Sequence, residues 1–272
     1  MNFILSSEAV PSGTAKLQAV RRTAVLRGKK SLSFCALLLT LLFCACGIED
    51  FPVLPPIPQS NVIQQFNDRA TVYIPNDYVG TAFTNFAIYY RIYVSDILQS
   101  STSSESIFST INPVLAADYT AFKGYIDSTT AISVDMDRVF QGRNYKLLAL
   151  ESNDNILSSS SVFGTNIEFN FSSSRAPTMT AGSNTYTLWR SDGGGLFSPQ
   201  PDRLFRNREE LYRTENLVPT INADVQQPRS GVAEGHLYTY AAMFIVAVGV
   251  NPSSYSNIYS TPALIHVFQL PD

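Results

Sequence analysis

Apolar and polar residues follow two patterns along this chain, and both predict β-strands. In residues 85–96, NFAIYYRIYVSD, aromatic and β-branched side chains alternate imperfectly with polar ones before a Ser/Thr-rich stretch, which is typical of a half-buried strand. In residues 237–250, LYTYAAMFIVAVGV, both alternating positions are apolar, which predicts a central strand buried on both faces. Residues 260–270, STPALIHVFQL, follow an Asn-Pro-Ser-Ser break and predict the partner strand of a long-looped hairpin.

Two shorter segments carry a helical pattern instead. They are PVLAADYTAFKGYI, residues 113–126, and PDRLFRNREELYR, residues 201–213. Each lies between predicted strands, and insertions of this kind are tolerated because loop-closure entropy grows slowly with length. The pattern therefore predicts an all-β fold with short helical insertions.

Several of these segments recur along the chain at a nearly constant distance. VFQGRNYKLLAL, from residue 139, and VAEGHLYTYAAM, from residue 232, place Val, Gly and Tyr at the same spacing. The Ser-Asp pairs at 95–96 and 191–192, and the strands NIEFNF from 166 and LIHVFQ from 264, recur in the same order. Such a repeat predicts two modules of about 95 residues each.

The paired features resemble fibronectin type III-like domains, which are β-sandwiches. The resemblance is carried by Gly142-x-x-Tyr145 and Gly235-x-x-Tyr238, which match the turn and the tyrosine that open strand F, and by the hairpin near Pro262. It implies tandem sandwiches over residues 63–173 and 174–272. The alternative is one enlarged β-sandwich whose halves look alike because amphipathic hairpins do.

The N-terminal region has the charge order of an export signal. A basic segment at residues 21–30 precedes an apolar run, residues 32–45, that is shorter than the roughly 20 residues a membrane-spanning helix needs. Residues 42–47, Leu-Phe-Cys-Ala-Cys-Gly, resemble a bacterial lipobox in the relaxed form of spirochaetal lipoproteins. The resemblance implies cleavage before Cys46 and its acylation, with Cys44 the poorer candidate because bulky Phe43 precedes it. A cleaved leader without lipid and a buried helix are the alternatives.

The lipobox divides the N-terminal region into two parts. Residues 1–45 form a signal peptide under this interpretation, and residues 46–62 form a lipidated, proline-rich tether between the bilayer and the fold. Four prolines between residues 52 and 58 favour an extended spacer. Two or more acyl chains on Cys46 would make the lipid bilayer a lasting partner.

Composition excludes several classes of function. The segment after residue 45 keeps 13 of the 19 Lys and Arg residues but 21 of the 22 Asp and Glu residues, a formal net charge of −8. Nucleic acid is therefore not expected as a partner, because phosphate binding depends on clustered basic side chains. All three cysteines lie at or before residue 46, which leaves the mature chain no disulfide, thiolate metal site or cysteine nucleophile once Cys46 is acylated.

Candidate chemistry in the rest of the chain is sparse. The two histidines, His236 and His266, lack partners at metal-ligand spacing. We expect His236 to be a turn residue and His266 to be a core residue. Asp135 and Asp137 share one face if that segment is extended, and we interpret them as solvated strand-edge charges. A rival hypothesis joins them to Glu234 as the acids of a glycan-directed enzyme. No metal, cofactor or catalytic residue is predicted.

The remaining candidates for recognition are aromatic. Tyr255 and Tyr259, in NPSSYSNIYS, lie on the predicted loop between the last two strands, where tyrosine offers rigid, amphipathic contact area. We therefore predict a non-enzymatic, lipid-anchored binding or adhesion protein of a bacterial envelope, at the outer membrane or cell surface, that contacts an unknown protein or glycan. A periplasmic structural subunit of an envelope complex and a carbohydrate-active accessory protein are the alternatives.

Overall fold

The computed structural model describes residues 53–79, 81–99, 111–126, 128, 134–150, 156–172, 176–191, 205, 224–226 and 238–271. All of them belong to one compact unit, Phe51–Asp272. The signal peptide predicted over residues 1–45, Cys46 and the helical segment predicted over residues 201–213, apart from Phe205, lie outside these ranges. Within the part of the chain that is described, no helix combines the length and apolar character needed to cross a membrane.

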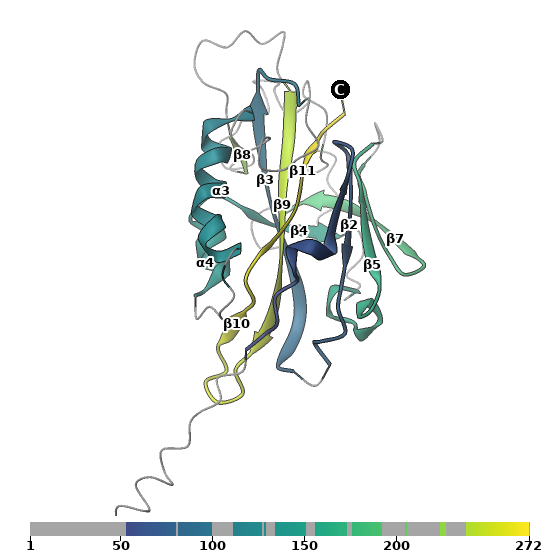
Figure 1. The fold of residues 1–272 in the computed structure, drawn as a ribbon, viewed down its shortest axis with the longest axis vertical. Coiled ribbons are helices and arrows are strands. Elements are labelled where there is room, and N and C mark those ends of the chain that lie inside the picture. The colour runs from purple at the N-terminus through teal and green to yellow at the C-terminus, as the bar shows by residue number, and fades with distance from the viewer. Residues whose placement is uncertain are drawn as a thin grey trace, which may run out of the picture. The chain divides into compact units, whose positions relative to one another are not determined.

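Strands make up most of the described unit, and Figure 1 shows their arrangement. They are β1 (Val62–Gln65), β2 (Arg69–Tyr73), β3 (Phe83–Ser95), β4 (Lys146–Leu150), β5 (Asn166–Asn170), β6 (Thr178–Ala181), β7 (Asn184–Arg190), β8 (Val225–Gln226), β9 (Tyr238–Val250), β10 (Asn257–Tyr259) and β11 (Ala263–Gln269). The helices are α3 (Pro113–Ile126) and α4 (Met136–Gln141), with short 3₁₀ turns at Gln59–Asn61, Ile156–Ser158 and Ser160–Val162. The all-β class is confirmed, and the helix predicted over residues 113–126 is α3.

The strand predicted to be buried on both faces is β9, which pairs with β3 along its length and with β10 and β11 on its other edge. Its side chains point alternately to two separate apolar clusters. Tyr240, Ala242, Phe244 and Val246 belong to one cluster, while Ala241, Met243, Ile245 and Ala247 belong to the other. Because successive side chains of a strand point to opposite faces, a strand that is apolar at every position has a core on each side.

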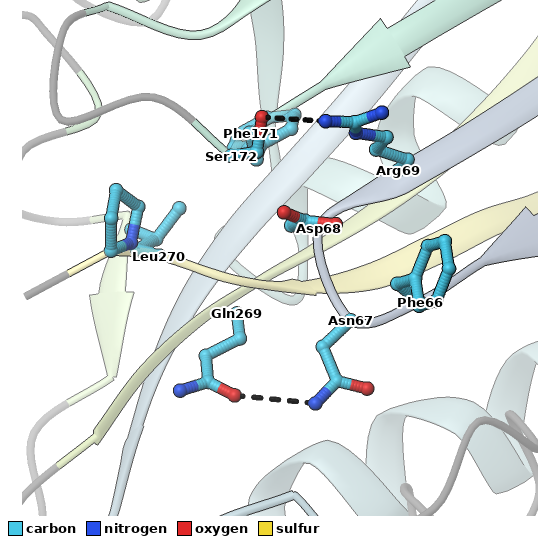
Figure 2. A pocket seen from close by; sticks show the side chains of 9 residues that line it. Phe66, Asn67, Asp68, Arg69, Phe171, Ser172, Gln269 and Leu270 are labelled. Atoms are coloured by element: carbon cyan, nitrogen blue, oxygen red, sulfur yellow. Dashed lines mark hydrogen bonds between the residues drawn. The ribbon is translucent and has the colours of Figure 1, made fainter.

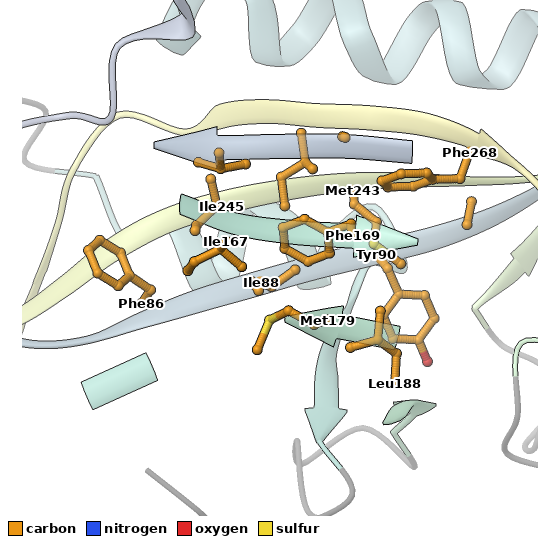
Figure 3. Packing of buried hydrophobic residues seen from close by; sticks show 14 of the residues in the cluster. Phe86, Ile88, Tyr90, Ile167, Phe169, Met179, Leu188, Met243, Ile245 and Phe268 are labelled. Atoms are coloured by element: carbon orange, nitrogen blue, oxygen red, sulfur yellow. The ribbon is translucent and has the colours of Figure 1, made fainter. Parts of the chain in front are cut away.

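The two cores have different covers. Leu115 and Phe122 of α3 and Phe140 of α4 join the cluster on one face of β3 and β9, where Phe122 lies 5.1 Å from Phe244, centroid to centroid. On the other face, β2, β5, β6 and β7 fold back over β3 and β9 (Figures 1 and 3). In that core, Phe169 of β5 packs with side chains from β9 and β11 (Figure 3). The unit therefore has a helical layer, a middle sheet and a second sheet layer.

A single hydrogen-bonded path connects the two sheet layers. Its order is β1-β2-β5-β6-β7-β4-β3-β9-β10, with β11 on β9 and β8 on β3, and every pairing except β3 with β8 is antiparallel. Because β7 pairs with β4 and β4 with β3, the sheet curls over onto itself. Strands from both predicted modules are hydrogen bonded to each other in this path. The finer prediction of tandem fibronectin type III-like modules is therefore not confirmed.

The repeated sequence segments adopt different positions in the sheet. Tyr145 and Tyr238 each stand at the start of a strand, as the repeat predicts. However, β4 is a short strand between β3 and β7, whereas β9 is the long central strand. Likewise β5 lies between β2 and β6, whereas β11 lies beside β9. The recurring sequence pattern therefore marks where strands begin. It does not determine which strands pair, because pairing depends on which faces of each strand must be buried.

A buried polar cluster fixes α3 on the sheet. The Asp118 carboxylate accepts hydrogen bonds from Arg91 Nη1 at 2.6 Å, the Tyr93 hydroxyl at 2.7 Å and Arg143 Nη1 at 2.8 Å. The Tyr93 hydroxyl lies 2.8 Å from that of Tyr145, the tyrosine that precedes β4. We call these five residues the α3 cluster. It ties the helix to β3 through a fully engaged carboxylate.

The segment after the predicted tether is part of the fold. Leu54 and Ile57 are only 3% exposed, and the Tyr78 hydroxyl donates to the Pro55 carbonyl at 2.9 Å. Leu54 lies against Gly249 of β9, where an added Cβ would come within 2.3 Å of the Ala82 carbonyl oxygen. The tether predicted over residues 46–62 therefore ends earlier than expected, because the chain packs on the unit from Leu54 onward.

Candidate ligand-binding hollow

The structure separates the two tyrosines that the sequence placed together. Tyr255 lies on the loop between β9 and β10, is 84% exposed and has a backbone φ of 55°. Tyr259 lies on β10, is 9% exposed and packs in the cluster under the helices. Burial raises the pKa of the Tyr259 hydroxyl. Tyr255 alone is open to a ligand, and it stands on the same end of β9 as Leu54.

The aspartates of the rival enzyme hypothesis have structural roles. The prediction of an extended segment at Asp135 and Asp137 is wrong, because Asp135 caps the N-terminus of α4 and accepts from Arg138 N at 3.2 Å. Asp137 accepts from the Tyr89 hydroxyl at 3.0 Å and from Gln141 Nε2 at 2.7 Å. Burial, with the Asp137 charge beside it, raises the pKa of Tyr89. The third acid, Glu234, lies outside the described residues.

His266 is fully buried on β11, as expected for a core histidine. Its Nε2 lies 2.8 Å from the Phe66 carbonyl oxygen, and because a carbonyl can only accept, Nε2 carries the proton. Nδ1 has no hydrogen-bond partner among the described residues. Burial lowers the pKa of His266, although the bond to Phe66 and the charge of Asp68 oppose that shift. The other histidine, His236, lies outside the described residues.

A β-bulge near His266 changes which core each residue of β11 enters. The register of β11 against β9 shifts between Leu264 and His266. As a result Leu264 and Val267 join the core under the helices, while Ile265 and Phe268 join the core between the sheet layers. Strict alternation would have placed Leu264 and Phe268 on one face.

A hollow of about 510 Å³ opens where the turn between β1 and β2 meets the ends of β5 and β11, and Figure 2 shows it from close by. We call it the turn hollow. Its lining comes from residues 66–69, 171–172 and 269–271. Two backbone hydrogen bonds hold these three segments together, from Gln269 N to the Asn67 carbonyl and from Phe171 N to the Asp68 carbonyl, each 2.7 Å long.

The turn hollow combines an apolar wall with unlike polar groups. Phe171 is buried and stacks on Phe268 with ring centroids 4.3 Å apart, which makes this wall rigid. Arg69 Nη2 lies 3.4 Å from Ser172 Oγ, a long hydrogen bond. In Figure 2 the Asp68 carboxylate points toward the space bounded by Leu270 and Ser172. Among the described residues no hydrogen bond or ion pair engages that carboxylate, so it can accept from a ligand.

The remaining side chains of the hollow are an amide pair and an aromatic ring. Asn67 Nδ2 lies 3.3 Å from the Gln99 carbonyl and 3.5 Å from Gln269 Oε1. Phe66 is 72% exposed with a φ of 58°, a left-handed conformation that residues other than glycine, asparagine and aspartate rarely adopt. Together these groups offer donors, acceptors and a ring within one concave surface, which is the composition of a small-molecule site.

Sequence reasoning did not identify this hollow. Its lining residues come from three segments that lie about 100 residues apart in the chain, and none of the segments has a motif spacing of its own. The one local signal is the dipeptide Asn67-Asp68 between two short alternating runs, which is typical of a hairpin turn. That signal predicts the turn but not the surface it helps to form.

Among the described residues, no group of three or more His, Cys, Asp or Glu side chains is placed to hold a metal ion. No protein-family model matches this chain, and neither does any curated protein or solved structure. The site is therefore interpreted from its own geometry.

Proposed function

We propose that the chain is a lipoprotein of a bacterial cell envelope, anchored through acylated Cys46, and that its folded unit is a non-enzymatic binding or adhesion module for a protein or glycan. The lipobox-like sequence at residues 42–47 supports the anchor. Asp135 and Asp137 are each held by hydrogen bonds around α4, which favours binding over hydrolysis by these acids. We expect the protein to be located at the outer membrane or on the cell surface.

The observation that carries the proposal is the placement of the turn hollow relative to the start of the folded unit. Leu54 packs against Gly249 near the end of β9, and Gln269, at the hollow, pairs with Tyr240 near its start. At about 3.3 Å per residue, these two positions on β9 are roughly 30 Å apart. In Figure 1 the C-terminal end of the chain and the loop that follows β9 accordingly lie at opposite ends of the long strands.

An anchor at Cys46 gives this arrangement a function. Six residues separate Cys46 from Val53, where the described residues begin, and an extended chain over these seven steps reaches about 20 Å. The end of the unit that carries Leu54 and Tyr255 would therefore face the bilayer. The turn hollow would face away from it, where a soluble or cell-bound ligand can reach it.

The anchoring step can be tested with a matched pair of cysteine variants in a bacterial host that processes lipoproteins. We expect the wild-type chain and Cys44→Ser to incorporate labelled palmitate and to partition into the detergent phase of a phase-separating detergent. Cys46→Ser should lose the label and leave both the membrane fraction and the detergent phase. A variant that stays bound with its leader uncut would count against the anchor. Labelling of Cys46→Ser at the wild-type level would refute acylation at this residue.

A further inference from the structure

The turn hollow is built on a backbone conformation that folding alone does not favour. Phe66 has a left-handed φ and exposes most of its ring, and both features work against stability. The conformation is nevertheless held firmly, by the His266 Nε2–H donated to the Phe66 carbonyl at 2.8 Å and by Gln269 N donated to the Asn67 carbonyl at 2.7 Å. These hydrogen bonds fix the backbone of the turn while the Phe66 ring stays exposed, so the turn is preorganised to contact a ligand.

The polar groups of the hollow keep capacity for a ligand. The Asp68 carboxylate has no hydrogen-bond or ion-pair partner among the described residues, and the hydrogen bonds that the Arg69 and Asn67 side chains make are between 3.3 and 3.5 Å long. Long bonds of this kind are weak and can be exchanged for shorter ones. One acceptor-only group, one donor-only group and two amides therefore stand around the apolar wall of Phe171 and Leu270.

The charge balance of the hollow decides between ligand classes. One guanidinium faced by one carboxylate does not favour a phosphate, which binds where positive charge is in excess. A single carboxylate is also too few ligands for a divalent cation, which takes six or more oxygens. A neutral ligand with many hydroxyl groups uses both charges at once, because vicinal hydroxyls can donate to a carboxylate and accept from a guanidinium.

The apolar groups of the hollow also fit a neutral ligand with many hydroxyl groups. A pyranose ring presents C–H groups on one face, and these pack against an aromatic ring such as that of Phe66. The volume of about 510 Å³ is within the range of small-ligand sites. We propose that the turn hollow binds a neutral saccharide unit, with Asp68 and Arg69 bonded to its hydroxyl groups and Phe66 packed on its C–H face. This inference rests on the proposed binding function and names its ligand class.

The test is saturation-transfer NMR on the mature, lipidated chain in a detergent without a sugar headgroup. The probes are maltose, cellobiose, lactose and N,N′-diacetylchitobiose, with tri-alanine and inorganic phosphate as probes of the other two ligand classes. We expect at least one disaccharide to bind and the tri-alanine and phosphate signals to stay at background. Binding of tri-alanine or phosphate without any disaccharide would overturn the saccharide assignment.

Four variants locate the binding. Asp68→Asn removes the charge at constant shape, and Phe66→Asn removes the ring but keeps a residue that accepts the left-handed conformation. Each should weaken disaccharide binding about tenfold or more, the loss expected for one charged hydrogen bond or one packed ring. Ile63→Ala, an exposed position on the same hairpin, and Tyr255→Ala, at the opposite end, should bind as the wild type does.

Failure of the saccharide proposal can be told apart from failure of the proposed function. If no disaccharide binds but cells that display the chain still adhere to a protein-coated surface in a Phe66-dependent way, the binding function stands and the ligand class is wrong. If disaccharide binding is lost in Tyr255→Ala and kept in Asp68→Asn, the hollow is not the site. If neither disaccharides nor protein-coated surfaces are bound, both proposals fall.

Discussion

Two aspartates of this chain differ in how far the protein engages their carboxylates, and the difference distinguishes a structural role from a proposed binding role. Asp118, in the α3 cluster, has a side chain that is only 4% exposed and accepts three hydrogen bonds of 2.6 to 2.8 Å. Asp68, in the turn hollow, accepts none from the described residues. A buried charge is tolerated only when its hydrogen-bonding capacity is filled by the protein. A half-buried charge beside a concave surface keeps that capacity for a ligand.

The difference extends to the backbone that supports each group. Asp118 projects from the regular helix α3, whose first turn is capped by Asn112 Oδ1 accepting from Val114 N at 2.8 Å. Asp68 follows Phe66, which is held in a left-handed conformation by a buried histidine. The α3 cluster therefore stabilises the fold, whereas the turn hollow keeps a backbone conformation that lowers the stability of the fold.

The largest expected effect is on the α3 cluster. Asp118→Ala leaves Arg91 buried without its carboxylate, and removal of one partner of a buried ion pair typically lowers the free energy of unfolding by about 3–5 kcal/mol. Urea denaturation followed by circular dichroism measures the loss. Arg143→Ala is the matched control, because its side chain is 38% exposed and the change should cost about 1 kcal/mol or less. Equal losses in both variants would refute the structural role assigned to Asp118.

A second prediction concerns the support beneath the turn hollow. The folded-state pKa of His266 is lowered, so the unfolded chain takes up a proton first as pH falls below about 6.5. Stability should therefore be complete above that pH and decline as pH falls toward the folded-state pKa. His266→Gln keeps an N–H donor for the Phe66 carbonyl but does not titrate, and its stability should change less over this range.

Urea denaturation at a series of pH values between 7.5 and 5 measures this dependence in the wild-type chain and in His266→Gln. The negative charge of Asp68 opposes the lowering of the His266 pKa. Asp68→Asn should therefore steepen the decline in stability between pH 7 and pH 5. A wild-type chain whose unfolding free energy is constant between pH 7.5 and pH 5 would contradict the assigned role of His266.

A smaller change, of opposite sign, is expected at Phe66. Asparagine tolerates the left-handed backbone better than phenylalanine, and Phe66→Asn also removes an exposed apolar ring. We expect the free energy of unfolding to rise by up to about 1 kcal/mol, in the range of other relieved backbone strains. Urea denaturation at pH 7.5, with Tyr73→Asn as a control on the same hairpin, measures it. A clear loss of stability would show that the Phe66 ring serves the fold.

The smallest effect is expected for the unengaged carboxylate. Asp68→Asn should leave the free energy of unfolding at pH 7.5 within about 0.5 kcal/mol of the wild-type value, as substitutions away from structural contacts usually do. The same denaturation series as for Asp118 measures it. A loss near that of Asp118→Ala would mean that the two aspartates have similar roles, and the comparison would fail.

Local pattern predicted the long elements well for a physical reason. The run of apolar residues in β9 has no polar face to present to water, so it must lie between two cores, and the structure places it there. Short elements carry less information. The six residues of α4 show no clear helical period, and the cap at Asp135 is the one signal that distinguishes this segment from a strand edge.

Pairing across the sheet depended on contacts that sequence does not display. The recurring Gly-x-x-Tyr segments predicted where β4 and β9 begin, but the partners of each strand are set by which faces require burial. The bulge in β11 changes the face of Leu264 relative to Phe268 without any glycine to mark it. The turn hollow was unpredictable for the same reason, since its three segments become neighbours only through these pairings.

The most direct test of the account is an amide chemical-shift map of the isotope-labelled mature chain on addition of the tightest-binding disaccharide from the panel of maltose, cellobiose, lactose and N,N′-diacetylchitobiose. The account predicts shifts concentrated in residues 66–69, 171–172 and 269–271, with the α3 cluster and residues 251–256 unchanged. Shifts centred on the Tyr255 loop, or no shifts with any of the four sugars, would contradict it.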